Sequence, residues 1–182
     1  YMFPDTYLFH PDVTASEVVS TMRNNFYKKY DEELQNKVKK LGLTPDQGVI
    51  LASIVEREAR SDEARRMAAS ILLKRYKIEM GLNADATIQY ALVKKGTLTP
   101  PADGWWKRSL TKDDFKINSP YNTYLHRGLP PAPISNPSLS SLQAVANADP
   151  STPYLYYYHD SRGVPHYAKT LEEHNANVAN YP

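Results

Sequence analysis

The stretch Leu51-Ala-Ser-Ile-Val-Glu-Arg-Glu-Ala-Arg60 guides the interpretation of the whole chain. Its residues are mostly good helix formers, and neither Gly nor Pro interrupts it. Thr44 or Asp46 can cap the start of this helix, with Pro45 in the first turn. At about 100° per residue, apolar side chains gather on one helix face, namely Leu51, Ala52, Ile54, Val55 and Ala59. The stretch therefore predicts a helix that packs on the core along one face.

Two carboxylates on this helix occupy different positions. Glu58 falls inside the apolar face, whereas Glu56 falls at its edge, where Arg60 four residues on is the expected ion-pair partner. Because an ionised carboxylate is costly to bury, a Glu in apolar surroundings shifts its pKa upward and stays protonated. A protonated carboxyl suits a general acid. The alternative for Glu58 is an ordinary ion pair or an exposed position, with partners available at Arg57, Arg60 and Arg65.

The composition is that of an ordinary globular protein, and we expect one domain over residues 1–182. Apolar residues make up 41% of the chain and charged residues 23%. The net charge of +2 gives no indication of nucleic-acid binding. The chain has no Cys, which excludes a disulfide framework and thiolate chemistry. No cluster has the ligand spacing of a metal site, so we expect neither a metal nor a cofactor.

The hydrophobic pattern predicts an α+β fold, mainly helical with a small antiparallel sheet that includes a C-terminal β-hairpin. Helices are expected at about 16–40 with a break near 30–31, at 61–75, at 138–147 and after Thr170. Residues 154–158 form the strongest predicted strand, followed by a turn at 159–163 and a returning strand at 165–169.

Several side chains have two interpretations. The basic residues of the helix predicted at 61–75 can bind anions or keep that helix soluble. We favour solubility for Arg65, Arg66, Lys74 and Arg75. Trp105 and Trp106 can form a sugar platform or hold their loop against the body, and we favour the second. His166 can be a site residue, but a pair at the rim of the sheet is the simpler interpretation.

Five short blocks follow one another along nearly the whole chain. They are Phe3-Pro-Asp-Thr-Tyr7, Ala52-Ser-Ile-Val-Glu-Arg-Glu58, Leu82-Asn-Ala-Asp-Ala-Thr-Ile-Gln-Tyr90, Ser119-Pro-Tyr-Asn-Thr-Tyr124 and Gly128-Leu-Pro-Pro-Ala-Pro-Ile134. Together they resemble the signature blocks of the endolytic murein transglycosylase family, also called the YceG-like family. The resemblance implies endolytic cleavage of peptidoglycan glycan strands. It also implies that Glu58, the second Glu of its block, is the catalytic acid.

The implied reaction needs only one carboxyl. The C6 hydroxyl of N-acetylmuramic acid attacks its own anomeric carbon and leaves a 1,6-anhydro end. Glu58 protonates the leaving oxygen and then takes the hydroxyl proton, while intramolecular attack supplies the nucleophile at high effective concentration. Two alternatives remain open. One is a lysozyme-type hydrolase with Asp85 as its second carboxylate, and the other is a non-catalytic glycan-binding module with a Tyr-rich cleft.

The matched blocks also suggest the substrate contacts, which we expect at Glu56, Asn83, Asp85, Tyr121, Asn122 and Tyr124. The last three lie on a proline-stiffened loop that can form neither regular helix nor central strand. Such a loop can project an amide toward an acetamido group and aromatic rings toward a sugar face. The family usually has Gln where Asn83 stands. Asp85 has an alternative role as the cap of the helix that follows it.

The chain contains no apolar run of the roughly 20 residues that span a bilayer. It starts inside the first block, so we expect an excised catalytic domain of a longer bacterial protein. The resemblance implies that the longer protein carries an N-terminal membrane helix and a LysM-like domain, both missing here. It also implies action at the extracytoplasmic face of the cell membrane on peptidoglycan strands, with the cell-wall synthesis machinery as a further partner. Contact with the membrane is expected only through the missing anchor.

Overall fold

The computed structural model describes residues 1–94, 106–107 and 109–181. Within these ranges the chain forms α1 (Ala15–Lys29), α2 (Glu32–Lys40), α3 (Pro45–Glu58), α4 (Asp62–Lys77), α5 (Asp85–Lys94), the 3₁₀ turn η1 (Asp114–Lys116), α6 (Leu139–Ala146), β1 (Tyr156–His159), β2 (Pro165–Ala168) and α7 (Leu171–Asn180). The two strands form one antiparallel sheet. This confirms the predicted α+β class with its C-terminal hairpin.

Side chains cap the starts of α1, α2, α3, α4, α6 and α7. Thr44, rather than Asp46, caps α3 and forms a capping box with Gln47, and Pro45 is the first helical residue. The expected break near residue 30 is present, and Asp31 caps the helix that follows it. The other side-chain caps follow the same chemistry, at Thr14, Ser61, Ser138 and Thr170.

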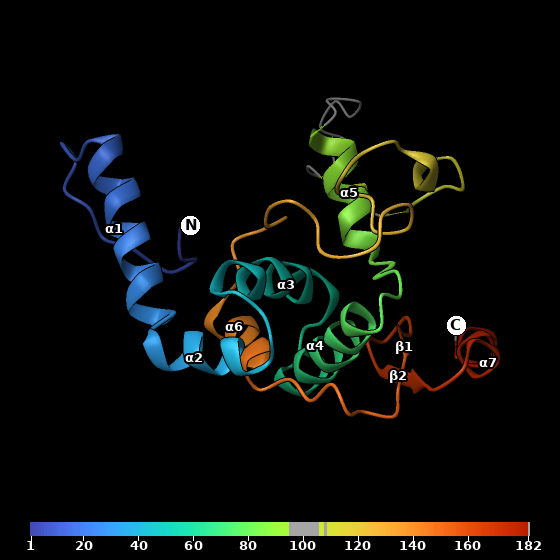
Figure 1. The fold of residues 1–182 in the computed structure, drawn as a ribbon. Helices are drawn as coiled ribbons and strands as arrows, with labels where there is room; N and C mark the ends of the chain where they lie inside the picture. The colour runs from blue at the N-terminus through green and yellow to red at the C-terminus, as the bar shows by residue number, and fades with distance from the viewer. Residues whose placement is uncertain (95–105, 108, 182) are drawn as a thin grey trace.

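The centre of the molecule is formed by α3, α4 and α6, which pack against one another (Figure 1). The apolar face predicted for α3 is buried, with Leu51, Ile54 and Val55 all at 0% exposure. The α2 helix crosses α3 at Gly48, where an added Cβ would lie 2.7 Å from Val38 Cγ1. Only glycine allows this approach without a shift of the Val38 side chain.

α5 and the C-terminal hairpin lie next to this centre. α5 packs against α3, and the hairpin packs against α4 and carries α7 on its other side (Figure 1). In the hairpin, Tyr157 pairs with Tyr167 and Tyr158 pairs with His166. The first strand of the hairpin, β1, begins at Tyr156, two residues later than predicted. Within the described residues, no helix combines the length and apolar character needed to cross a membrane.

Candidate active site

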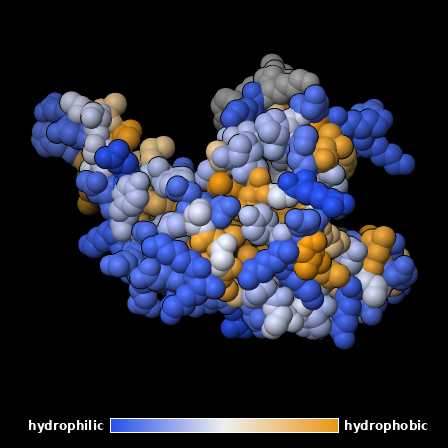
Figure 2. Space-filling view, viewed as in Figure 1, coloured by the Kyte–Doolittle hydropathy of each residue, from blue (hydrophilic) through white to orange (hydrophobic). Residues whose placement is uncertain are grey.

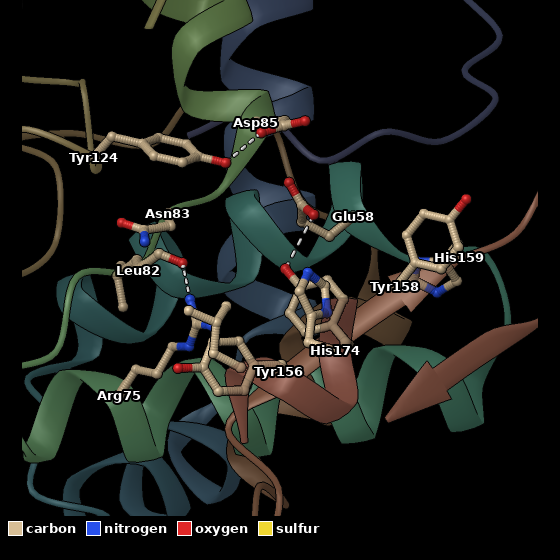
Figure 3. A pocket seen from close by; sticks show the side chains of 12 residues that line it. Glu58, Arg75, Leu82, Asn83, Asp85, Tyr124, Tyr156, Tyr158, His159 and His174 are labelled. Carbon is tan, nitrogen blue, oxygen red and sulfur yellow. Dashed lines mark hydrogen bonds between the residues drawn. The ribbon is translucent and has the colours of Figure 1, made fainter. Parts of the chain in front are cut away.

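A pocket of about 440 Å³ lies between α5 and the hairpin, next to the end of α3. The space-filling view shows a recess between the part of the molecule that carries α5 and the part that carries the hairpin and α7 (Figure 2). Its lining comes from six segments of the chain, and consists of Glu58, Arg75, Leu82, Asn83, Asp85, Tyr124, Tyr156, Tyr157, Tyr158, His159, Leu171 and His174 (Figure 3).

Glu58 is the last residue of α3, and both of its carboxyl oxygens accept a hydrogen bond. The Ala86 backbone N–H donates to Oε1 at 3.3 Å, and the Tyr157 hydroxyl donates to Oε2 at 3.0 Å. Ala86 lies in the first turn of α5, so the carboxyl caps a helix that is far from it in sequence. The partial positive charge of that helix end favours a carboxylate at this position.

The surroundings of Glu58 set its protonation. Burial raises its pKa above the ordinary value, and the nearby charge of Asp85 adds to this rise. The hydrogen bonds from Tyr157 and Ala86 and the charge of Arg57 act in the opposite direction, but they do not cancel the rise. The raised pKa expected from the helical wheel is thus present in the structure. Burial thus favours the protonated form of Glu58, while its two hydrogen bonds stabilise the carboxylate that remains after it releases the proton.

Asp85 lines the same pocket as Glu58, and Tyr124 holds its side chain. The Tyr124 hydroxyl donates to Asp85 Oδ1 at 2.5 Å. Burial, followed by this hydrogen bond and the charge of Asp85, raises the pKa of the Tyr124 hydroxyl, which therefore remains a donor. Tyr157 thus donates to Glu58 and Tyr124 donates to Asp85 around the same cavity. The sequence did not predict these two pairs.

Asn83 also lines the pocket, and its backbone lies in the left-handed region with φ of +49°. Asn adopts this conformation more readily than longer side chains do, because its short amide can bond locally. The preceding turn is tight, since a Cβ added to Gly81 would lie 2.7 Å from Asn83 Oδ1. The backbone geometry therefore gives a physical reason for Asn at this position.

Glu56 is not among the residues that line the pocket. It accepts hydrogen bonds from the Ser138 N–H at 2.9 Å, the Ser138 hydroxyl at 2.6 Å and the Ser141 hydroxyl at 2.7 Å. Its ion pair is with Arg65 at 3.5 Å, so the predicted pairing with Arg60 is wrong. Burial alone would raise the pKa of Glu56, but these hydrogen bonds and the charge of Arg65 lower it. The structure therefore shows Glu56 binding α3 to the start of α6.

Tyr121 and Asn122 also lie away from the pocket, with 4% and 0% of their surfaces exposed. The Asn122 amide donates to the carbonyls of Phe115 and Ile117, both at 2.9 Å. Its oxygen accepts the backbone N–H of Tyr124 at 2.9 Å. Because every polar group of this side chain is used inside the loop, the structure shows Asn122 shaping the segment that presents Tyr124.

Several pocket residues were not predicted from the sequence. Arg75 is 6% exposed and donates to the carbonyls of Leu82 at 2.8 Å and Leu155 at 2.6 Å. Its interpretation as a solubilising charge was therefore wrong. The run of tyrosines in β1 was recognised as a strand, but nothing in the sequence placed Tyr157 or His159 beside Glu58. The Tyr-rich composition was the only signal that pointed toward these side chains.

The remaining candidates have structural contacts. His166 stacks on Tyr181 with ring centres 4.0 Å apart, and its Nε2 lies 3.4 Å from the Asp160 carboxylate, as expected for a pair at the sheet rim. The Trp106 ring lies 4.4 Å from the Arg57 guanidinium, so this ring packs on the last turn of α3. Trp105 lies outside the described residues. The described residues contain no group of side chains that could hold a metal ion.

These features describe an α+β fold with a pocket that holds two carboxyls, of which Glu58 has a raised pKa. The chain belongs to the YceG-like family, which matches residues 1–180. It is 35% identical over 176 residues to the endolytic murein transglycosylase of Bacillus subtilis (strain 168), a match that covers 96% of this chain and 45% of that protein. The family assignment made from the five blocks is therefore confirmed.

Two more proteins are similar over the whole chain. The endolytic murein transglycosylase of Streptococcus pneumoniae serotype 2 is 31% identical over 185 residues, covering 100% of this chain and 32% of that protein. A crystal structure of a yceG-like protein from Listeria monocytogenes superposes with a TM-score of 0.81 at 32% identity, covering 97% of this chain and 53% of the other. The chain thus spans less than half the length of the curated relatives that it matches.

Proposed function

We propose that this chain is the catalytic part of an endolytic peptidoglycan lytic transglycosylase. It would cleave the bond between N-acetylmuramic acid and N-acetylglucosamine within glycan strands. The observation that carries the proposal is the Glu58 carboxyl, which lines the pocket with a raised pKa and a hydrogen bond to each oxygen. The relatives described above, which are named endolytic murein transglycosylases, support the same substrate.

In the proposed reaction, Glu58 serves first as an acid and then as a base. Its proton moves to the glycosidic oxygen while the bond from that oxygen to C1 of the muramic acid breaks. The resulting carboxylate is stabilised by the Tyr157 hydroxyl and the Ala86 N–H. It then takes the proton of the C6 hydroxyl while O6 bonds to C1. The 1,6-anhydro ring closes, Glu58 regains its proton, and no water is consumed.

We assign substrate positioning to Asn83, Asp85 and Tyr124, which share the pocket with Glu58. The Tyr124 hydroxyl fixes Asp85, and the Asp85 carboxylate can accept hydrogen bonds from sugar hydroxyls. The rings of Tyr156 and Tyr158, which line the same cavity, offer apolar surfaces for sugar faces. Correct placement of the C6 hydroxyl matters here, because the rate of an intramolecular attack depends on orientation.

A second candidate is a glycoside hydrolase in which Asp85 activates water. It is favoured by one observation, namely that Asp85 lines the same pocket and its charge raises the pKa of Glu58. Two carboxyls that face one cavity are the arrangement used by ordinary glycosidases. The two reactions differ in their products, since the anhydro end is lighter than the hydrolysed end by one water.

Mass spectrometry of peptidoglycan digested with the purified protein tests both candidates. Anhydro ends support the transglycosylase, and reducing ends support the hydrolase. Glu58→Gln keeps the shape of the side chain but removes the transferable proton, so it should abolish either product. Glu56→Gln serves as the matched control on the same helix and should retain the product. Full product formation by Glu58→Gln would contradict both candidates.

We further infer that the longer protein acts at the extracytoplasmic face of the bacterial cell membrane, together with the cell-wall synthesis machinery. The inference is supported by the relatives named as murein transglycosylases, since murein lies outside the membrane. Protease accessibility of the full-length protein in intact spheroplasts tests the location. Co-purification with glycan-polymerising enzymes tests the partnership, and failure to co-purify after crosslinking would count against it.

A further inference from the structure

Two histidines on the hairpin side of the pocket have no part in the proposed reaction. His159 ends β1, and His174 lies on α7, where it stacks on Tyr156 with ring centres 5.4 Å apart. Both line the cavity that contains Glu58. In the close view, His174 and Tyr156 lie on the side of the pocket opposite Asp85 (Figure 3). His174 therefore faces the cavity from the side opposite Asp85, and His159 lies on the strand that also carries Tyr157, the hydrogen-bond partner of Glu58.

Each of these two rings has a buried nitrogen without a partner. Among the described residues, four buried side-chain polar atoms lack a hydrogen bond. Two of them belong to the pocket histidines, at His159 Nε2 and His174 Nδ1, and the other two are Arg65 Nε and the Tyr167 hydroxyl. Since buried polar groups are normally bonded, these two nitrogens bear on which nitrogen of each ring carries the proton.

The buried nitrogens indicate which tautomer each ring adopts. Burial lowers the pKa of both histidines, helped by Arg75 at His174 and by His166 at His159, so both rings are neutral at neutral pH. A neutral imidazole carries one proton. We assign the proton of each ring to its other nitrogen, because the buried nitrogen has no acceptor to which it could donate. His174 then carries Nε2–H, and His159 carries Nδ1–H.

We propose that His174 and His159 bind the glycan by donating hydrogen bonds from these N–H groups to its acceptor oxygens. The acceptors are acetamido carbonyls or sugar hydroxyls. This proposal rests on the proposed function and extends it. It makes the pocket complementary to a glycan, because the Asp85 carboxylate can accept hydrogen bonds from sugar hydroxyls while the two histidines donate to sugar oxygens.

The placement of α7 agrees with such a role. This helix packs against β1 and β2, yet none of its residues is fully buried. Leu171 lines the pocket although half of its surface is exposed, and His174 follows it three residues later on the same helix face. α7 therefore contributes little to the core and presents one face to the cavity, as expected of a substrate-binding helix.

Binding to an acetylated glycan oligomer tests the proposal in a Glu58→Gln background, which prevents turnover. His174→Phe keeps the stack on Tyr156 but removes the nitrogens, and should weaken binding by about threefold to tenfold, the usual contribution of one hydrogen bond. His174→Gln restores a donor and should recover affinity. His159→Phe should show a similar loss. His126→Phe is the matched control, because His126 is exposed and lies outside the pocket.

The active enzyme gives a second readout. With Glu58 intact, His174→Phe should raise KM by a similar factor and leave kcat nearly unchanged, as removal of uniform binding does. A de-N-acetylated oligomer distinguishes the acceptors: the effect of His174→Phe disappears if the acceptor is an acetamido carbonyl and persists if it is a hydroxyl.

The outcomes separate failure of this proposal from failure of the proposed function. If Glu58→Gln binds glycan, and both His174→Phe and His159→Phe bind it equally well while remaining folded, the histidines have no binding role. If binding falls but His174→Gln does not recover it, the ring acts only by packing and the proposal is overturned. If the Glu58→Gln protein binds no glycan and the wild-type protein yields no cleavage product, the proposed function itself fails.

Discussion

Replacing Tyr157 by Phe tests how the protein controls its catalytic carboxyl. The Tyr157 hydroxyl donates to Glu58 Oε2 at 3.0 Å and stays protonated, because burial and the charge of Glu58 raise its own pKa. This hydrogen bond favours the ionised form of Glu58. A hydrogen bond to a charged group contributes about 1.5–3 kcal/mol. Its loss should therefore raise the pKa of Glu58 further, by about 1–2 units.

The predicted change is visible in the pH dependence of kcat/KM on a soluble glycan oligomer. Glu58 must be protonated for the first step, so its pKa sets the alkaline limb of the profile. Tyr157→Phe should move this limb upward by about 1–2 units. The maximal rate should fall by about tenfold to a hundredfold, because the carboxylate formed in the transition state loses a donor.

Tyr167→Phe is the matched control, since Tyr167 pairs with Tyr157 across the hairpin and its hydroxyl has no partner among the described residues. Tyr167→Phe should leave both the alkaline limb of the kcat/KM profile and the maximal rate unchanged. If Tyr157→Phe leaves the alkaline limb unchanged or shifts it downward, the hydrogen bond does not control the protonation of Glu58. The account of Glu58 as an acid balanced by Tyr157 would then be refuted.

Three further predictions concern stability. Asn122→Ala should lower the free energy of unfolding by about 2–4 kcal/mol in urea denaturation, because it leaves several buried backbone groups unpaired; a loss within error would show that the loop repacks. Glu56→Gln should cost about 1–2 kcal/mol while kcat is retained, since it weakens the bonds to Ser138, Ser141 and Arg65. Burial raises the pKa of Glu58 in the folded state, so its contribution to stability is present below its ordinary pKa and lost as pH rises through the raised value. Glu58→Gln should therefore become more stable relative to wild type as pH increases, and a constant difference in melting temperature across this range would contradict the raised pKa.

The parts of the fold that depend on neighbours in sequence could be predicted. The apolar face of α3, its Thr44 cap and the break before Asp31 follow from helical periodicity and from short polar side chains that bond nearby N–H groups. The Thr170 cap followed in the same way. In each case the deciding interaction joins residues three or four positions apart, which a single sequence displays directly.

Interactions between distant segments could not be predicted. Arg75 lies on a helix with other basic residues, so its sequence context indicates a solvated side chain, whereas its guanidinium bonds carbonyls before α5 and before β1. The loop that carries Asn122 is a second example, because it brings Tyr124 to the pocket while Asn122 is buried within the loop. Hydrophilic residues in a turn-rich segment suggest ligand contact, yet this amide is used to satisfy the buried carbonyls of its own loop.

The contrast between Glu56 and Glu58 shows how one helix assigns opposite roles to the same residue type. Both carboxyls meet the start of another helix, Glu56 at α6 and Glu58 at α5. Hydroxyl donors and Arg65 surround Glu56 and lower its pKa, so it stays ionised and holds two helices together. Glu58 ends α3 beside the pocket, where burial and the charge of Asp85 outweigh its two donors. Glu56 and Glu58 are about 200° apart around the helix. Their side chains therefore leave the helix on different sides and meet different neighbours. The helical wheel could therefore separate the two residues before any contact was known, although it could not identify Tyr157 or Ala86 as the donors.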